Sequence, residues 1–307
     1  MEFNKVERDL LQAVADLHSI PQGAVNIRRD GEAVLRRSSP NIEIVGKTDR
    51  PGIDIIVKPG TVNESVHIPV ILTRSGFKDV VYNTFIIGEG SDVLVVAGCG
   101  IHNAGQDVSR HDGIHEVIVK KGARMRYVEK HYGEGRPEAQ RILNPNTVIT
   151  VEEGAQAEME LVQIRGVDHT RRVTTAYIYD RGSLKIVEKL LTHRDQEAES
   201  TIEIHLVGTG GVAQVISRSV AQESSRQEFR AALIGKARSN GHVECDAIIM
   251  DRAQIRSVPE LVAENAEAVL THEAAIGRIA GEQLIKLMSL GLTEQEAVDA
   301  ILSGFLR

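Results

Sequence analysis

The sequence predicts a mainly β protein, a parallel β-helix with a short N-terminal helix before the strands and a C-terminal helical segment after them. From about residue 24 to about residue 251, apolar and polar residues alternate with period two, as in Ile202 to Leu206. Such alternation is typical of strands with one buried face. Turns in which a polar residue or glycine precedes a glycine recur about every 30 residues, a period that predicts stacked coils sharing one core.

The repeated turns are Pro59-Gly60, Glu89-Gly90, Lys121-Gly122, Glu153-Gly154, Arg181-Gly182 and Gly210-Gly211. Glycine suits such turns because it adopts backbone conformations that other residues avoid. A β-sandwich of evenly spaced hairpins would also give regular turns, and the pattern alone leaves this alternative open. The recurring period favours the β-helix, and we expect it to occupy residues 24–257.

A helix is expected over residues 2–18, within an N-terminal region of residues 1–23. Its apolar residues recur at helical spacing with charged residues between them. These residues are Phe3, Val6, Leu10, Val14 and Leu17.

A helical segment is expected over residues 258–307. Gly291 fits the end of one helix, and Thr293 with Glu296 forms a capping box that begins the next. The apolar stripe of the first helix would contain Ile276, Ile279, Ala280, Leu284, Leu287 and Met288. An amphipathic hairpin of this kind either packs on the solenoid or binds a partner.

Composition excludes several classes of function. The net charge of −7 argues against a nucleic-acid-binding protein. No run of about 18 apolar residues predicts a membrane helix, and the N-terminus lacks a signal-peptide pattern. With only two cysteines in 307 residues, a disulfide framework is not expected. We therefore expect a cytoplasmic protein in a reducing compartment.

The two cysteines are the residues most able to carry chemistry. Cys99 lies between Gly98 and Gly100, which would leave room for a substrate or another sulfur atom to approach. His111 follows nearby in the sequence, and an imidazolium beside a thiol lowers its pKa. Cys245 lies in an alternating strand, as a core residue would. A buried structural role is open for both, because cysteine is among the most buried residue types.

The C-terminal third resembles the SufB/SufD scaffold family of iron–sulfur cluster assembly. Upstream, Gly98-Cys99, Ser109-Arg110-His111, Glu116 and Arg126-Tyr127 extend the resemblance. It covers nearly all of the chain and is strongest over residues 225–307. The motifs of that third are Cys245 to Ile249, His272-Glu273-Ala274, Glu282 to Leu284, Gly291 to Ala297 and Ser303-Gly304-Phe305.

The resemblance implies a right-handed β-helix that acts as an assembly scaffold and not as an enzyme. It implies a transient iron–sulfur cluster at the interface of a homodimer or heterodimer of scaffold subunits, and a SufC-like ABC ATPase that docks on the C-terminal helices. By position, Cys245, Glu273 and His272 are the expected cluster ligands. Cys99 and His111 are expected to take part in sulfur transfer.

Two departures from the SufB pattern stand in this chain. Thr271 occupies the position of a family glutamate, and His131-Tyr132 stands near a family Gln-Asn-Trp segment. Two other functions remain open: a purely structural SufD-like partner without its own cluster, and a carbohydrate-active β-helix enzyme. The second needs stacking aromatic residues, and it fits poorly with 3% aromatic residues and no tryptophan.

Overall fold

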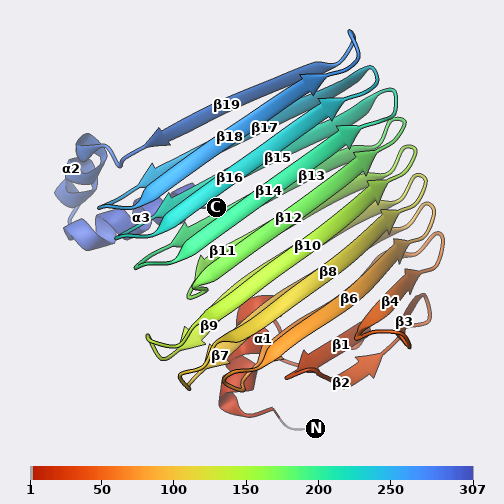
Figure 1. The fold of residues 1–307 in the computed structure, drawn as a ribbon, viewed down its shortest axis with the longest axis horizontal. Helices are drawn as coiled ribbons and strands as arrows, with labels where there is room; N and C mark the ends of the chain where they lie inside the picture. The colour runs from red at the N-terminus through yellow and green to blue at the C-terminus, as the bar shows by residue number, and fades with distance from the viewer. Residues whose placement is uncertain (1–2, 307) are drawn as a thin grey trace.

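A computed structural model describes residues 3–306. It confirms the mainly β prediction: 59% of the residues lie in strands, which form a parallel β-solenoid of about 8 turns. Figure 1 shows the strands stacked from the N-terminal to the C-terminal end, with helical segments near both ends of the chain. Each coil contributes one strand to each of two sheets.

The elements follow one another in a regular series. They are α1 (Lys5–Ala15), β1 (Ala24–Arg29), β2 (Glu32–Arg37), β3 (Ile42–Gly46), β4 (Gly52–Val57), β5 (Val62–Leu72), β6 (Lys78–Ile87), β7 (Asp92–Asn103), β8 (Ser109–Val119), β9 (Arg124–Gly135), β10 (Arg141–Val151), β11 (Gln156–Arg165), β12 (His169–Ile178), β13 (Ser183–Thr192), β14 (Glu197–Leu206), β15 (Gly211–Ala221), β16 (Arg226–Gly235), β17 (Ser239–Ile249), β18 (Gln254–Ala263), β19 (Val269–Gly277), α2 (Gly281–Ser289) and α3 (Glu294–Phe305).

The sheet topology is that of a solenoid and not of a sandwich of hairpins. One sheet has the order β19-β17-β15-β13-β11-β9-β7-β5-β1-β2, and the other has the order β18-β16-β14-β12-β10-β8-β6-β4-β3. Among the described strands, the antiparallel pairs are β1 with β2 and β3 with β4, both at the N-terminal end. Every other pair is parallel, which excludes the β-sandwich.

Parallel stacking places like residues above one another in the interior. One inward column of the first sheet consists of Val66, Val95, Tyr127, Met159, Ile186, Val215 and Val243. All seven side chains are buried in the main hydrophobic cluster. Because burial of one such side chain contributes about 1.5–3 kcal/mol, columns of this kind supply most of the stability of the solenoid.

The glycine turns have the predicted backbone geometry in most coils. Gly60, Gly90, Gly122 and Gly154 have φ between +62° and +72°, and Gly210 has φ +76°. At the turn Arg181-Gly182 the left-handed residue is Arg181, with φ +54°. The repeated glycine-containing pairs thus lie at the turns, although glycine is not always the residue in the left-handed conformation.

Helix α1 is shorter than predicted and packs on the outer face of the first sheet. Asn4 and Glu7 form a capping box at its start, so the helix begins at Lys5 and not at residue 2. It contacts β5, β7 and β9. A Cβ atom on Gly98 would lie 2.2 Å from the Val14 carbonyl oxygen, and one on Gly100 would lie 3.1 Å from Leu10 Cδ2.

The expected change from strands to helices at residue 258 is wrong. Strands β18 and β19 continue the solenoid to Gly277, and the first C-terminal helix begins at Gly281. The expected stripe therefore began too early, because Ile276 belongs to β19. The alternation weakens in this last coil since most of its residues are exposed or only partly buried.

The two C-terminal helices differ in how they contact the solenoid. Leu302 and Leu306 at the end of the chain pack with Val220 in one hydrophobic cluster, so α3 is docked on the sheet. The predicted capping box of Thr293 and Glu296 is present, and Gly291 has the predicted left-handed conformation, with φ +100°. Helix α2 buries none of its residues.

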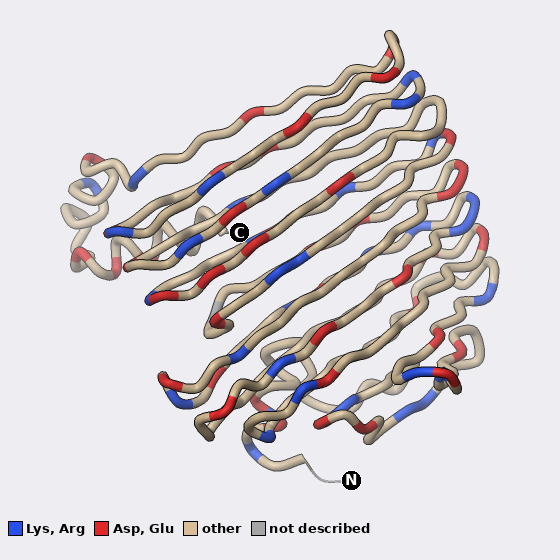
Figure 2. Tube along the Cα trace, in the orientation of Figure 1, with Lys and Arg blue, Asp and Glu red and all other residues tan. Residues whose placement is uncertain are grey.

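The outer surface carries both signs of charge. Figure 2 shows acidic and basic residues interspersed over the coils and turns. Many lie in cross-strand pairs, such as Glu160 with Lys189 at 2.8 Å. Within residues 3–306, every helix is too short or too polar to span a bilayer.

We predict that Gly98→Val lowers the free energy of unfolding by about 1–3 kcal/mol, because the new side chain overlaps the Val14 carbonyl group. Residues 3–18 should also become sensitive to protease. Gly277→Val is the matched control, since no atom lies within 4 Å of a Cβ atom there. Urea unfolding with limited proteolysis measures both effects. Equal stability of the two variants would contradict the packing role of Gly98.

Candidate functional site

Cys99 lies on β7 and faces the interior of the solenoid. Its side chain is 8% exposed and belongs to a buried cluster with Val70 and Ile101. The two glycines do not widen the space beside the thiol as expected, because a Cβ atom on either of them would meet helix α1 on the outer face of the strand. The two glycines thus allow the helix to dock, and the sulfur atom is directed toward the interior.

Histidines surround the Cys99 thiol, including the predicted His111. Burial would raise the pKa of the thiol, but the charge and hydrogen bond of His111, with those of His131, lower this pKa from 9.0 to about 7. Burial would lower the pKa of His111, but the Cys99 thiolate and Asp79 raise it to about 10. The charges around Cys99 therefore favour a thiolate–imidazolium pair with His111.

Asp79 holds His111 from the other side. Its carboxylate lies 3.1 Å from His111 Nδ1 and 2.8 Å from Arg28 Nη2. Although burial opposes ionisation, the hydrogen bonds of His111 and Arg28 keep the pKa of Asp79 well below its usual range. The buried imidazole is thus fixed in orientation by an ionised carboxylate.

A row of buried charged side chains continues from Cys99 along the interior. His131 Nε2 lies 3.2 Å from the Glu129 carboxylate, which lies 2.7 Å from Arg172 Nη1. Arg172 Nε is 3.4 Å from Glu188, and Ser200 Oγ donates a hydrogen bond of 2.8 Å to Glu188. We call His131, Glu129, Arg172 and Glu188 the interior row.

The charges of the interior row stabilise one another. Burial opposes ionisation of Glu129, yet the positive charges of Arg172 and His131 hold its pKa well below the usual range. Burial raises the pKa of Glu188, and one of its carboxylate oxygens has no hydrogen-bond partner. The row therefore ends in a carboxyl group with free hydrogen-bonding capacity.

Cys245 shares an inward column of the first sheet with Glu188 of the interior row. Strand register places Ser217 beside Glu188 and Cys245 beside Ser217. The thiol is 2% exposed and accepts a hydrogen bond of 3.2 Å from Ser257 Oγ on the opposite sheet. Burial raises its pKa. Both cysteines thus face one interior, separated by charged and hydroxyl side chains.

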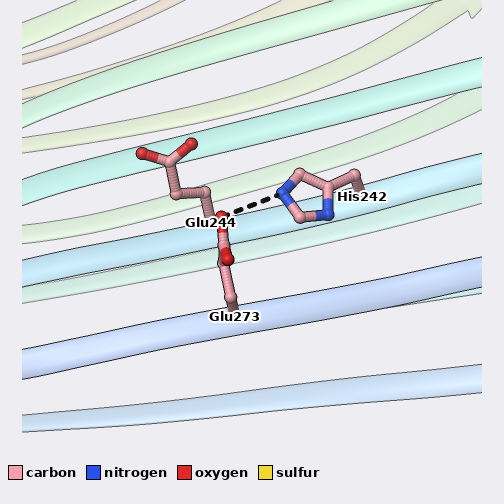
Figure 3. A group of neighbouring side chains, drawn as sticks. All are labelled: His242, Glu244 and Glu273. Carbon is pink, nitrogen blue, oxygen red and sulfur yellow. Dashed lines mark ion pairs between the residues drawn. The ribbon is translucent and has the colours of Figure 1, made fainter.

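The structure places His272 and Glu273 on opposite faces of β19. His272 is aligned with the inward Val243, and Cys245 is aligned with Ala274 two positions along. His272 therefore shares the face of Cys245. Glu273 is aligned with the outward Glu244 and lies 3.7 Å from His242 Nε2 (Figure 3). Within one chain, Glu273 is not brought to the Cys245 thiol.

The interior row was not predicted from the sequence. Its residues occupy inward positions of their strands: Glu129 and His131 have the same parity as the buried Met125 and Tyr127. Arg172 has the parity of Ala176 on β12. A charged residue at an inward position of a predicted strand is the signal that could have identified the row.

The C-terminal end of the solenoid is open. Strands β18 and β19 are the last in their sheets, so each has one unpaired edge. Apolar side chains are exposed on this coil: Val269 is 58% exposed, Ile276 is 43% exposed and Leu261 is 38% exposed. His272 is also exposed, and Cys245 lies one coil further inside.

Known proteins resemble this chain over most of its length. A SufBD family protein of iron–sulfur cluster assembly from Methanothermobacter thermautotrophicus strain Delta H is 33% identical over 230 residues, which are 73% of this chain and 54% of that protein. One from Archaeoglobus fulgidus is 30% identical over 279 residues, covering 89% of this chain and 73% of that protein. The chain thus spans about half of the first relative.

A relative from Pyrococcus horikoshii, also named as a SufBD family protein of iron–sulfur cluster assembly, is 28% identical over 292 residues, covering 90% of this chain and 85% of that protein. Residues 72–305 match the SufBD core domain of the SUF system for FeS cluster assembly. This range contains both cysteines, the interior row and the C-terminal helices. The chain therefore belongs to the SufBD family, whose role lies in iron–sulfur cluster assembly.

Proposed function

We propose that this chain is a scaffold on which an iron–sulfur cluster is built, with sulfur entering at Cys99 and the cluster forming at Cys245. The observation that carries the proposal is the placement of both cysteines in one interior, joined by the interior row and Ser217. An iron–sulfur cluster needs soft thiolate ligands. A sulfur atom that moves between the two cysteines needs polar groups beside it and protection from water.

Cys99 is suited to accept sulfur. Its thiolate attacks the outer sulfur of a donor persulfide, so that the donor S–S bond breaks, the donor leaves as a thiolate and Cys99 becomes a persulfide. No net oxidation occurs, because the sulfane sulfur only changes its partner. His111 stabilises the thiolate before attack. His131, which also interacts with the thiol, is the first residue of the interior row.

Cys245 and His272 are suited to hold the nascent cluster. Iron binding displaces the thiol proton that burial otherwise retains, and imidazole is a weaker second ligand that allows later release. One thiolate per chain is too few for a stable cluster, so a second scaffold subunit at the open end completes the site. Glu273 faces outward and is not part of this ligand set.

The open end also fits such a subunit physically. Unpaired edges of β18 and β19 present free backbone donors and acceptors, which proteins normally cover or protect. A second copy related by a two-fold axis would cover these edges and the exposed Val269. It would also bring a second Cys245 and His272 to the same end.

Helix α2 is the proposed docking surface for a SufC-like ABC ATPase. It stands apart from the solenoid with none of its residues buried, whereas α3 anchors the hairpin through Leu302. Ile285 and Leu290 are 68% and 72% exposed, and Met288 is exposed between them. An apolar helix face of this kind fits a hydrophobic groove on a partner.

We predict that Cys99 reacts as a thiolate with an apparent pKa of about 7. About half of the thiol is then ionised at pH 7, against about 1% for a pKa of 9. His111→Gln removes the stabilising charge, so the rate at pH 7 should fall roughly tenfold while the rates converge above pH 9.

The measurement is the rate of methanethiosulfonate modification from pH 5 to pH 10, in a Cys245→Ser background. His205→Gln is the control, because this histidine lies on the outer face, away from Cys99. An apparent pKa near 9 in the otherwise unchanged chain would contradict the thiolate assignment.

We predict that Cys245→Ser loses most of the visible absorption gained on anaerobic reconstitution with Fe²⁺ and sulfide, and that His272→Ala weakens it. Cys99→Ser should reconstitute normally, because free sulfide bypasses the entry point. When a persulfide donor with a thiol reductant, which supplies the two electrons that convert sulfane sulfur to sulfide, replaces free sulfide, Cys99→Ser should become slow. Normal reconstitution of Cys245→Ser would return this residue to a purely structural role.

We predict that the double substitution Ile285→Asp and Leu290→Asp abolishes co-purification with the cognate ATPase. The fold should survive, because both side chains are exposed. Val148→Asp is the matched control, an exposed apolar residue on β10 far from the helices in sequence and in the stack (Figure 1). Undiminished binding by the double variant would exclude α2 as the docking surface.

A further inference from the structure

Three side chains with metal-binding atoms meet on the outer face of the first sheet. His242 and Glu244 come from β17 and Glu273 comes from β19, and one ligand atom from each lies within 4.8 Å of the others. Figure 3 shows the three side chains on the same side of the two neighbouring strands. Regular alternation directs them away from Cys245, so this group is separate from the interior site.

The pairing of Glu244 with Glu273 is electrostatically unfavourable by itself. The two carboxylates are directly aligned on neighbouring strands, where like charges destabilise a sheet. Neither forms an ion pair with a lysine or arginine among residues 3–306; the partner of Glu273 is His242.

At one other position on the same outer face, opposite charges are aligned across three neighbouring strands. Glu158 is aligned with Arg126 on one side and with Lys185 on the other, and its carboxylate lies 3.8 Å from Lys185 Nζ. The aligned pair Glu244 and Glu273 has no lysine or arginine partner of this kind among the described side chains. A bound cation would supply the missing positive charge.

The orientation of His242 is the second, independent observation. Its Nδ1 lies 2.9 Å from Thr271 Oγ1, and the Thr271 hydroxyl lies 3.5 Å from the Gly241 carbonyl oxygen. When the hydroxyl donates to this carbonyl, it accepts Nδ1–H from the ring, and the lone pair of Nε2 is directed toward Glu273. Metal-binding histidines are commonly fixed in this way by a partner of the second ring nitrogen.

We propose that His242, Glu244 and Glu273 bind one divalent first-row transition-metal ion, with Thr271 as the residue that positions the imidazole. One imidazole and two carboxylates suit Fe²⁺, Mn²⁺, Co²⁺ or Zn²⁺. The absence of a thiolate from this set distinguishes it from the interior site. Fe²⁺ is the ion of choice in cluster assembly, and this identification rests on the proposed function, whereas the site itself does not.

The exposure of the group fits an ion that exchanges. The His242 side chain is 34% exposed and that of Glu273 is 68% exposed, so water can complete the coordination shell and the ion can leave. The site lies on the last two strands of the first sheet, β17 and β19, at the open end where the cluster is proposed to form. It would hold iron near the point of assembly without competing for the cysteines.

The test is Co²⁺ and anaerobic Fe²⁺ titration of the Cys99→Ser, Cys245→Ser chain, followed by calorimetry and by the visible bands of Co²⁺. We expect one ion per chain and no sulfur-to-cobalt charge-transfer band. Glu244→Gln, Glu273→Gln and His242→Ala should each weaken binding at least tenfold. Thr271→Val should weaken it about tenfold, and Thr271→Ser should restore it.

His169→Ala is the matched control, because this histidine also lies 3.7 Å from a glutamate on the neighbouring strand, but Glu197 also pairs with Arg226. Its affinity should stay within about twofold of the parent. A thermal scan without metal adds a readout: Glu273→Gln should melt higher than the parent, because it removes the like-charged pair.

No saturable binding by the parent, or equal binding by Glu273→Gln and His169→Ala, would overturn the inference. Loss of binding by Thr271→Ser as large as that by Thr271→Val would overturn the positioning role of Thr271. These titrations use a chain without cysteines, so they are independent of cluster reconstitution. Failure of Cys245 to support a cluster would leave the metal site standing, and the reverse also holds.

Discussion

Parallel stacking of successive coils in register is the constraint on which this structure depends. Because each strand is aligned with the strand of the next coil, the inward or outward direction of a residue is inherited along a column. One buried column therefore runs from Ala24 to Val243. The same rule directs Cys99 and Cys245 inward and Glu273 outward, so the chemistry of both faces follows from the register.

The two ends of the solenoid are built differently. At the N-terminal end, β2 and β3 fold back as antiparallel partners, and the edge strand β2 exposes Glu32 and Arg37, charges of the kind that discourage edge pairing. At the C-terminal end, β19 exposes Val269 and Ile276 with few charges. This asymmetry leaves the C-terminal edges of the sheets less protected by charge than the edge formed by β2.

The strands and turns could be predicted from the sequence, because alternation and a repeated glycine turn survive in every central coil. The boundary at residue 258 could not, since the last coil has no neighbour on one side and its residues need not be apolar. The predicted ligand set combined residues of one short motif, but His272 and Glu273 are adjacent in a strand and so face opposite ways. The contacts of Arg172 with Glu129 and Glu188 were not predicted because these residues lie on different strands and meet only across the core.

The interior row also specifies which coil stacks on which. Coils with similar apolar columns could be displaced by one repeat at a small cost in free energy. The packing energy of valine on valine differs little from that of valine on isoleucine. Glu129, Arg172 and Glu188 remove this ambiguity, since each is fully buried and needs its particular partner. A displaced coil would leave a charge unpaired in the core, which costs several kcal/mol. The interior row thus favours the observed stacking of these coils over displaced arrangements.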